Sequence, residues 1–578
     1  MNIKYTLSFP EPHTHYAEVE MHISGITTNE LNLQMAVWTP GSYLIREFQK
    51  NIDFVEWSAV DGQQSTTFSR VDKTDKNTWN IKNENSKEII IRYKIYCNEY
   101  SVRTNFVDDS HALINGASTF LYVKDFENTP SEIEIIPFQN WKNISTSLLQ
   151  KENNKWSRTS ANIDELIDSP IEIGNHISYF FDAANVSHEL AIYGESNCNT
   201  EKLIFDLKKI IVEETKIFGS HPCKNYVFFI HNTDNSFGGL EHLHSSVNHI
   251  TRWIYDAKNY QRPISLLAHE YFHLWNVKRI TPATLIPFNY NAENYTELLW
   301  FFEGVTSYYD DYVCYRAGVT SPEDFLDIVS KNVSGVLNTA GIDTQTLAEA
   351  SYDTWLKYYR RNENSNNTQI SYYTKGSVVA MIFDIIIMDS TNGEKCLDDV
   401  MFKLYSDYLA EPTKGITENS LLETFNSIGN IDFAPYFQKY IHTTAAIPVE
   451  SYFEVIGIQN IEPQQNNIYL GLLTQLKEGR LIIAELDKNY GAYQSGLNTS
   501  DEIIAIDGFR VAQDFNKTFV HKKVNDSIDV LISRQGTIKS YKVTLTADKR
   551  RNINFAVAEN VSEKQQILLK KWLQQNED

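Results

Sequence analysis

One short segment of this chain combines residue types and a spacing that suit chemistry. It is His269-Glu270-Tyr271-Phe272-His273, an H-E-x-x-H pattern inside a stretch of helical character. Residues four apart share one face of a helix, so both imidazoles point to one place. That geometry suits two ligands of a zinc ion, and the intervening glutamate is placed to handle a proton. The pattern predicts a zinc peptidase site. The alternative is a buried helix with two core histidines and a solvated glutamate.

A catalytic zinc site needs three protein ligands and a water, so a third ligand must follow. Glu303 is the best candidate. It lies 303 − 273 = 30 residues after His273 on a second helical run, which leaves room for a loop and an antiparallel return. Residues 300–302 beside it are apolar, and an unpaired carboxylate among them would be costly. Metal coordination removes that cost.

Gly304 supports this position, because glycine inside a helix costs about 1 kcal/mol relative to alanine. We therefore expect another element to approach closely there. A surface glutamate is the alternative interpretation of Glu303. Glu293 and Glu297 are weaker rivals as ligands, because their surroundings have the character of a loop and a helix start.

Several segments must position these residues, and their patterns predict a multidomain α+β protein. Period-two alternation over residues 1–170 predicts an antiparallel β domain. Residues 171–450 predict a mainly helical catalytic domain with a small sheet at its front, and residues 201–218 within it have the pattern of an amphipathic helix. The strand pattern returns over 455–550, and a charged, helix-prone tail covers 551–578. We expect the tail helix to cap the module before it.

Composition narrows the class of partner. The 578 residues contain 52 Lys plus Arg and 74 Asp plus Glu, so the net charge is 52 − 74 = −22. This surface argues against nucleic acid and against an anionic membrane as partners. The five scattered cysteines contain no C-x-x-C, which predicts reduced thiols. No signal-peptide pattern opens the chain, so a cytoplasmic location is expected.

The H-E-x-x-H segment with a downstream E-G on a second helix resembles the gluzincin clan, which includes thermolysin and aminopeptidase N. Two longer strings resemble the glycyl aminopeptidase family, peptidase family M61. They are residues 269–280 (H-E-Y-F-H-L-W-N-V-K-R-I) and residues 38–48 (W-T-P-G-S-Y-L-I-R-E-F). The resemblance runs from about residue 3 to about residue 550. It implies a thermolysin-like peptidase domain and one catalytic zinc ion held by His269, His273 and Glu303.

Two further functional positions follow from this resemblance. Gly238-Gly239-Leu240-Glu241-His242 is similar to the G-x-M-E-N strand of aminopeptidase N relatives, whose glutamate binds the α-amine of the substrate. Glu241 is the matching position, and the last residue departs from the pattern. The two glycines permit close approach of a substrate backbone, and the carboxylate beyond them could pair with an ammonium group. An ordinary edge-strand glutamate is the alternative.

The segment Y-Y-T-K-G at residues 372–376 resembles the Y-x-K-G string of the same relatives. There the tyrosine hydroxyl stabilises the tetrahedral oxyanion, and Tyr373 is the matching position. Tyr372 and Tyr373 are both open to a packing role on the sequence alone.

Residues 469–472 and 495–508 resemble the carboxylate-binding loop and a second conserved string of a PDZ domain. Such a module captures a chain terminus as an added strand, or it serves as a structural brace.

These observations together predict a zinc aminopeptidase that hydrolyses the N-terminal bond of peptides. The resemblance implies a preference for small first residues such as Gly or Ala. Its expected partners are peptides with a free N-terminus, and a C-terminal peptide is a candidate ligand of the PDZ module. The alternatives are a zinc endopeptidase that recruits substrates through that module, and a catalytically idle peptide-binding scaffold.

Overall fold

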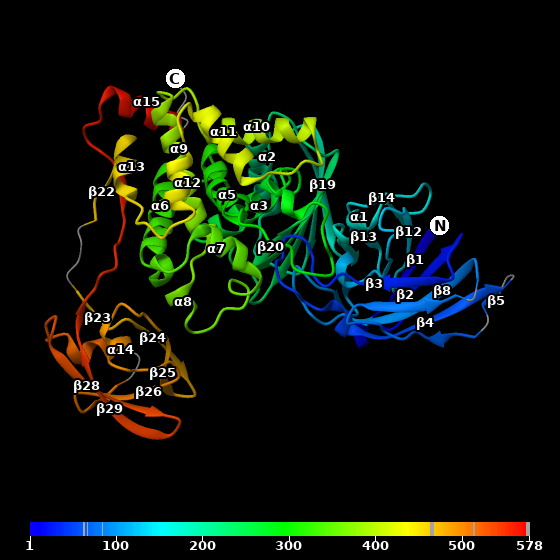
Figure 1. Cartoon of the computed structure of the whole chain (residues 1–578), viewed down its shortest axis with the longest axis horizontal. Coiled ribbons are helices and arrows are strands. Elements are labelled where there is room, and N and C mark those ends of the chain that lie inside the picture. The colour runs from blue at the N-terminus through cyan, green and yellow to red at the C-terminus, as the bar shows by residue number, and fades with distance from the viewer. Residues whose placement is uncertain (62–63, 66, 84, 463–466, 512–514, 574–578) are drawn as a thin grey trace. The chain divides into compact units, whose positions relative to one another are not determined.

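The computed structural model describes residues 1–578 except 62–63, 66, 84, 463–466, 512–514 and 574–578 (Figure 1). The chain forms two compact units, each built from several segments. The first unit contains Met1–Tyr295, Tyr309–Thr320 and Met401–Thr417. The second contains Thr296–Tyr308, Ser321–Val400 and Glu418–Asp578.

The first unit opens with a large β-sheet, as the alternating pattern predicted. Its strand order is β14-β15-β12-β1-β2-β8-β4-β5, with β6 paired to β4. The strands are β1 (Asn2–Ser8), β2 (Tyr16–Ser24), β4 (Ile52–Asp61), β5 (Gln64–Ser65), β6 (Ser69–Arg70), β8 (Glu88–Tyr96), β12 (Ser131–Ile136), β14 (Leu149–Gln150) and β15 (Ser157–Ser160). Every second residue of β2 is buried, so one face of the strand covers the core. The prediction of an antiparallel sheet is wrong for one pair of neighbouring strands, because β1 and β12 run parallel.

Two smaller sheets complete this β-rich part. The four-stranded sheet has the order β13-β16-β10-β9 and the three-stranded sheet the order β11-β3-β7. Their strands are β13 (Asn143–Thr146), β16 (Ile171–Gly174), β10 (His111–Ile114), β9 (Phe106–Val107), β11 (Tyr122–Val123), β3 (Glu30–Gln34) and β7 (Thr78–Lys82). All four residues of β10 and of β16 are buried, so these two strands are covered on both faces.

The first unit also contains the sheet whose strands directly precede the H-E-x-x-H segment in the chain. Its order is β17-β18-β19-β21-β20, with β18, β19 and β21 parallel and both edge strands antiparallel. The strands are β17 (Ile177–Ala183), β18 (Val186–Tyr193), β19 (Asn225–Thr233), β20 (Gly238–Glu241) and β21 (Ser245–Thr251). The amphipathic helix α2 (Thr200–Phe218) makes the crossover from β18 to β19, close to the predicted 201–218.

The second unit is mainly helical and is centred on α9 (Tyr372–Ser390), which is almost entirely buried. Around it pack α4 (Leu299–Phe302), α6 (Pro322–Leu337), α7 (Leu347–Tyr352), α11 (Glu418–Gly429) and α13 (Val449–Val455). Among the described helices, the stretch Ser365–Ser390 has the length and hydropathy of a membrane span. Because 83% of its apolar window is buried inside the structure, it has the burial of a core helix.

The last strands form a module with its own apolar core, running from Leu470 to Leu545. Its sheet order is β24-β25-β26-β28-β29, with β27 paired to β26. These strands are β24 (Leu472–Lys477), β25 (Arg480–Leu486), β26 (Glu502–Ile506), β27 (Phe509–Arg510), β28 (Ser527–Arg534) and β29 (Thr537–Thr544). The tail helix α15 (Glu563–Trp572) begins with a capping box. It does not cap this module as predicted, because it packs on α9. Trp572 fixes the helix there by donating a hydrogen bond to the Tyr308 hydroxyl at 3.0 Å.

Candidate active site

The two histidines of the H-E-x-x-H segment lie at the end of helix α3 (Gln261–Phe272), with His273 at its C-terminal cap. The helix is held from the sheet side, where the Tyr271 ring stacks on Phe228 of β19 with centroids 5.4 Å apart. One helical turn separates the two histidines, and their Nε2 atoms face each other at 3.1 Å.

Each histidine ring is fixed by a hydrogen bond at its other nitrogen. Nδ1 of His273 donates to the backbone carbonyl of Asn276 at 2.7 Å, and Nδ1 of His269 donates to Oδ2 of Asp310 at 2.9 Å. A carbonyl or carboxylate oxygen accepts, so each neutral ring carries its lone pair on Nε2. Two lone pairs at 3.1 Å repel each other, and a cation between them removes that repulsion. Burial raises the pKa of Asp310, and the hydrogen bond from His269 opposes this shift.

Glu303 lies at the junction of α4 and α5 (Gly304–Arg316) and is 2% exposed. The expected close approach at Gly304 is confirmed. A Cβ added there would stand 2.6 Å from the Cα of Gly376 on α9. His269, His273 and Glu303 each offer one ligand atom, and these atoms lie within 4.8 Å of one another. They form a candidate metal-binding group.

The two rival glutamates have different surroundings. Glu293 lies in a loop and is partly buried, and Glu297 is exposed. Glu297 groups with Glu418 and His442, whose Nε2 hydrogen-bonds both oxygens of Glu418 at 2.9 Å. Glu303 is therefore the most deeply buried of the three carboxylates.

The edge strand β20 lies beside α3 (Figure 1). A Cβ added to Gly239 would stand 2.1 Å from Oε1 of Glu270, so the general-base candidate rests directly on the backbone of this strand. Gly238 has φ +145° and nothing within 4 Å of an added Cβ, so the strand is open there. An open edge strand can pair with an extended peptide backbone.

Glu241 ends this strand and is 4% exposed. One of its oxygens, Oε1, is buried without a hydrogen-bond partner among the described residues. Its carboxylate, that of Glu270 and a ring nitrogen of His273 lie within 4.8 Å of one another. Gly41 of the 38–48 string covers the carboxylate, because a Cβ there would stand 2.5 Å from Oε2 of Glu241. Gly41 also has φ +86°, which favours glycine.

His242 follows Glu241 and is fully buried. Its Nδ1 hydrogen-bonds Oδ1 of Asp168 at 2.8 Å. The same carboxylate accepts from the backbone N–H of Leu243 at 2.8 Å and from Nζ of Lys278 at 2.9 Å. Burial alone would raise the pKa of Asp168, but Lys278 and His242 together lower it to about 2. His242, which replaces the Asn of the G-x-M-E-N pattern, therefore anchors the C-terminal end of β20 to Asp168.

The two tyrosines of the 372–376 segment differ in environment. Tyr372 is fully buried, and its hydroxyl pairs with Oγ1 of Thr354 at 2.9 Å. Tyr373 is partly exposed. Burial, followed by the negative charge of Glu303, raises the pKa of Tyr373 well above its usual value. Tyr372 therefore has a packing role, and Tyr373 keeps its hydroxyl protonated near Glu303.

Three residues of this site were not predicted from the sequence: Gly41, Asp310 and Asp168. Gly41 stood in a string quoted only for its resemblance, and its glycine in a tight loop was the available signal. Asp310 is an acidic residue seven positions after Glu303, which places the two on similar faces of a helix. Asp168 gives no local signal, because its partners lie more than 70 residues further along the chain.

Comparison with known proteins bears on the class. Residues 4–175 match the Peptidase M61 N-terminal domain model, and residues 262–379 match the M61 glycyl aminopeptidase model. No curated protein matches the chain. The structure of an aminopeptidase N family protein from Idiomarina loihiensis is 26% identical, covers 99% of this chain and 100% of that chain, and has a TM-score of 0.90. An M1 zinc metallopeptidase from Deinococcus radiodurans is 10% identical, covers 78% of this chain and 95% of that chain, and has a TM-score of 0.48.

The family models and the first of these structures identify a peptide hydrolase of the aminopeptidase type. Its N-terminal and catalytic segments are those of peptidase family M61, as the strings at 38–48 and 269–280 predicted. Neither model covers the C-terminal module, so its likeness to a PDZ domain stays a prediction.

Proposed function

We propose that the chain is a zinc-dependent aminopeptidase that removes small N-terminal residues, such as Gly or Ala, from peptides. The observation that carries this proposal is the pair of Nε2 lone pairs of His269 and His273, which face each other at 3.1 Å beside the buried Glu303. Two imidazoles and one carboxylate are a common ligand set of catalytic zinc. Asp310 and the carbonyl of Asn276 would orient the two rings.

The residues present fit a single zinc ion held by His269, His273 and Glu303. Bound there, zinc supplies Lewis-acid polarisation of the scissile carbonyl and an acidified water. Glu270 lies next to this ligand group and would take the water's proton at its carboxylate, then pass it to the leaving amine. The Tyr373 hydroxyl would donate to the oxyanion, a contact worth roughly 3–4 kcal/mol in other hydrolases.

Glu241 gives the proposal its exopeptidase character. A buried carboxylate with an unpartnered oxygen, next to an open edge strand, suits the ammonium group of a peptide N-terminus. Gly238 and Gly239 would let the substrate backbone lie along β20. The backbone of Gly41 covers the carboxylate. The proposed preference for a small first residue rests on the match to the M61 glycyl aminopeptidase model.

The C-terminal module supports a second, compatible role in peptide binding. Its edge strand β24 (Leu472–Lys477) follows the proposed carboxylate-binding loop and exposes Leu473 and Leu476 by 54% and 58%. We propose that a peptide C-terminus adds to this strand, as in PDZ domains. The loop itself is braced, because Gly471 has φ +77° and packs on Tyr490.

The alternatives differ in which substrates are cut. An endopeptidase recruited through β24 would cleave blocked peptides, and an idle scaffold would cleave none. The test is hydrolysis of Gly- and Ala-p-nitroanilide and their N-acetyl forms, with and without a zinc chelator. The proposal expects cleavage of the free forms only, loss on chelation, and recovery with zinc.

Two variants complete this experiment. Glu270→Gln should lower kcat by at least about 10²-fold, and Glu241→Ala should raise KM for free peptides. Equal rates on free and acetylated substrates would refute the aminopeptidase, and wild-type rates in Glu270→Gln would refute the site.

A further inference from the structure

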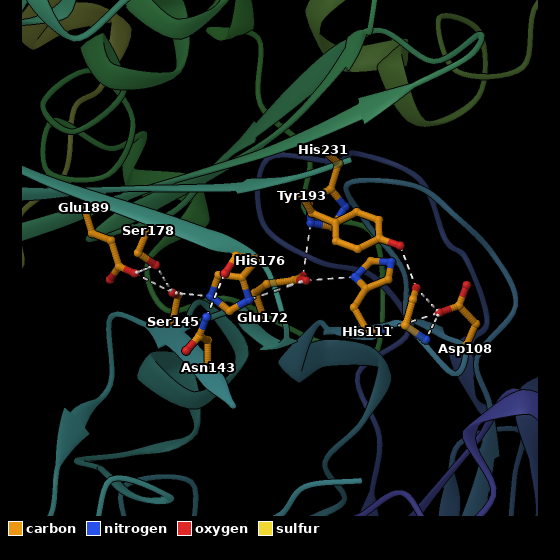
Figure 2. Close-up of polar contacts among 11 residues, drawn as sticks. Asp108, His111, Asn143, Ser145, Glu172, His176, Ser178, Glu189, Tyr193 and His231 are labelled. Atoms are coloured by element: carbon orange, nitrogen blue, oxygen red, sulfur yellow. Dashed lines mark hydrogen bonds and ion pairs between the residues drawn. The ribbon is translucent and has the colours of Figure 1, made fainter. Parts of the chain in front are cut away.

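A second buried group of histidines and a carboxylate shares no residue with the proposed active site (Figure 2). It consists of His111 on β10, Glu172 on β16 and His231 on β19, each no more than 1% exposed. Nδ1 of His111 lies 2.8 Å from Oε1 of Glu172, and Nε2 of His231 lies 3.0 Å from Oε2. The three ligand atoms lie within 4.8 Å of one another.

Glu172 needs a positive charge close by, because a buried carboxylate without a cation is costly. Among the described residues, its ion-pair partners are all histidines: His111, His176 and His231. No lysine or arginine pairs with it in that part of the chain. Two imidazoles with one carboxylate form a donor set that binds zinc and related divalent metals.

A third imidazole is aimed at the same carboxylate. Nδ1 of His176 lies 4.0 Å from Oε1 of Glu172 and is buried with no hydrogen-bond partner among the described residues. Its ring is held by Nε2, which hydrogen-bonds Oγ of Ser145 at 2.8 Å, and its backbone carbonyl accepts from Asn143 (Figure 2). A simple hydrogen-bond network around Glu172 leaves this nitrogen without a partner, whereas a cation at the cluster gives it a fourth coordination position.

The surroundings keep the cluster rigid and dry. The Tyr193 ring stacks on His111 with centroids 3.5 Å apart, and its hydroxyl pairs with Ser110 at 2.6 Å. Tyr100 stacks on His231 with centroids 5.6 Å apart. His111 and Glu172 come from the four-stranded sheet, and His231 comes from the sheet that precedes α3. A metal here would therefore tie two sheets of the first unit together.

We propose that His111, Glu172 and His231, with His176 as a fourth donor, bind a structural divalent cation, with Zn²⁺ as the best fit to the donor set. Four protein donors with no exposed face are typical of a closed, structural site. The inference does not rest on the proposed catalytic zinc.

Metal content per chain, measured by mass spectrometry after zinc loading and desalting, tests the site. The wild-type chain should hold two zinc ions and His269→Ala one. The double variant His111→Gln/His231→Gln should also hold one. A matched control is His22→Gln, because His22 pairs with Glu88 on the surface and its loss should leave two ions.

The outcomes separate the two sites. If the double variant holds two zinc ions, as the wild-type chain does, this inference is wrong. It is also wrong if the His269→Ala chain holds no zinc. A His269→Ala chain that still holds two ions instead overturns the proposed catalytic site and leaves this one standing.

A measurement that needs no cluster variant covers the case in which the double variant fails to fold. The full-length His269→Ala chain is stripped of metal, and its Tm is measured with and without added Zn²⁺. Zinc bound only by the folded chain should raise Tm by at least about 2 °C. An unchanged Tm overturns the proposal.

Discussion

Asp168→Asn tests how the chain fixes the strand end that carries Glu241. The variant removes the ion pairs of Asp168 with Lys278 and His242 and keeps an oxygen for the Leu243 N–H. The pKa of Asp168 is about 2 in the folded chain, against about 3.9 in an unfolded one. This difference corresponds to about 2–3 kcal/mol of stability at pH 7. Lys278, whose side chain is 7% exposed, would also lose its partner in the interior.

The sign of the pH dependence follows from the lowered pKa. The contribution is present in full above about pH 4, the unfolded value, and is lost as pH falls towards 2, the folded value. At pH 3 about half of it remains. The stability difference between wild type and variant should therefore be largest at pH 7 and about half as large at pH 3.

The assay is urea unfolding followed by tryptophan fluorescence at both pH values. Asp327→Asn is the control, because Asp327 and Lys331 form an exposed helical pair whose loss should cost less than about 1 kcal/mol. The reasoning is refuted if Asp168→Asn costs no more than the control. It is also refuted if the cost at pH 3 equals the cost at pH 7.

Four further substitutions have defined outcomes. Gly239→Ala places a Cβ 2.1 Å from Oε1 of Glu270 and must displace that carboxylate. The kcat should therefore fall by about 10²-fold while the circular dichroism spectrum stays unchanged. A wild-type kcat would contradict this. Tyr373→Phe should lower kcat by about 10²–10³-fold, whereas Tyr372→Phe should lower Tm with little change in kcat. Equal effects of the two variants on kcat would contradict the assignment of the oxyanion contact to Tyr373. Trp572→Ala should cost about 3–5 kcal/mol in urea unfolding, because the ring is buried against Phe325 and Phe453. A cost below about 1 kcal/mol would show that α15 is not docked through this ring.

Local chemistry made several parts of this molecule predictable. Gly304 inside a helix indicated a close neighbour, and Gly376 of α9 is that neighbour. The amphipathic pattern of α2 located it to within one residue. The H-E-x-x-H spacing predicted two imidazoles on one helix face, and their Nε2 atoms do meet. In each case the signal lies in residues a few positions apart, whatever their partners in the structure.

Long-range pairing is what the sequence could not supply. The parallel pairing of β1 with β12 joins strands more than 100 residues apart, and alternation alone does not choose a partner strand. The tail helix was assigned to the nearest module in sequence, whereas Trp572 packs against Phe325 and Phe453.

The candidate site divides in the same way. His269, His273, Glu303 and Glu270 stood in motifs, so the sequence proposed them. The covering of Glu241 by Gly41 and the anchoring of His242 by Asp168 depend on how the β-rich part folds onto β20. The cluster around Glu172 gave no motif, since its histidines come from separate strands of two sheets.

The central claim is that this site attacks only the first peptide bond of a chain with a free amine. The most direct measurement is mass-spectrometric analysis of the products that the zinc-loaded enzyme makes from one alanine-rich peptide, supplied with a free and with an acetylated N-terminus. We expect stepwise loss of single N-terminal residues from the free peptide and no cleavage of the acetylated one. Internal fragments from the acetylated peptide would contradict it.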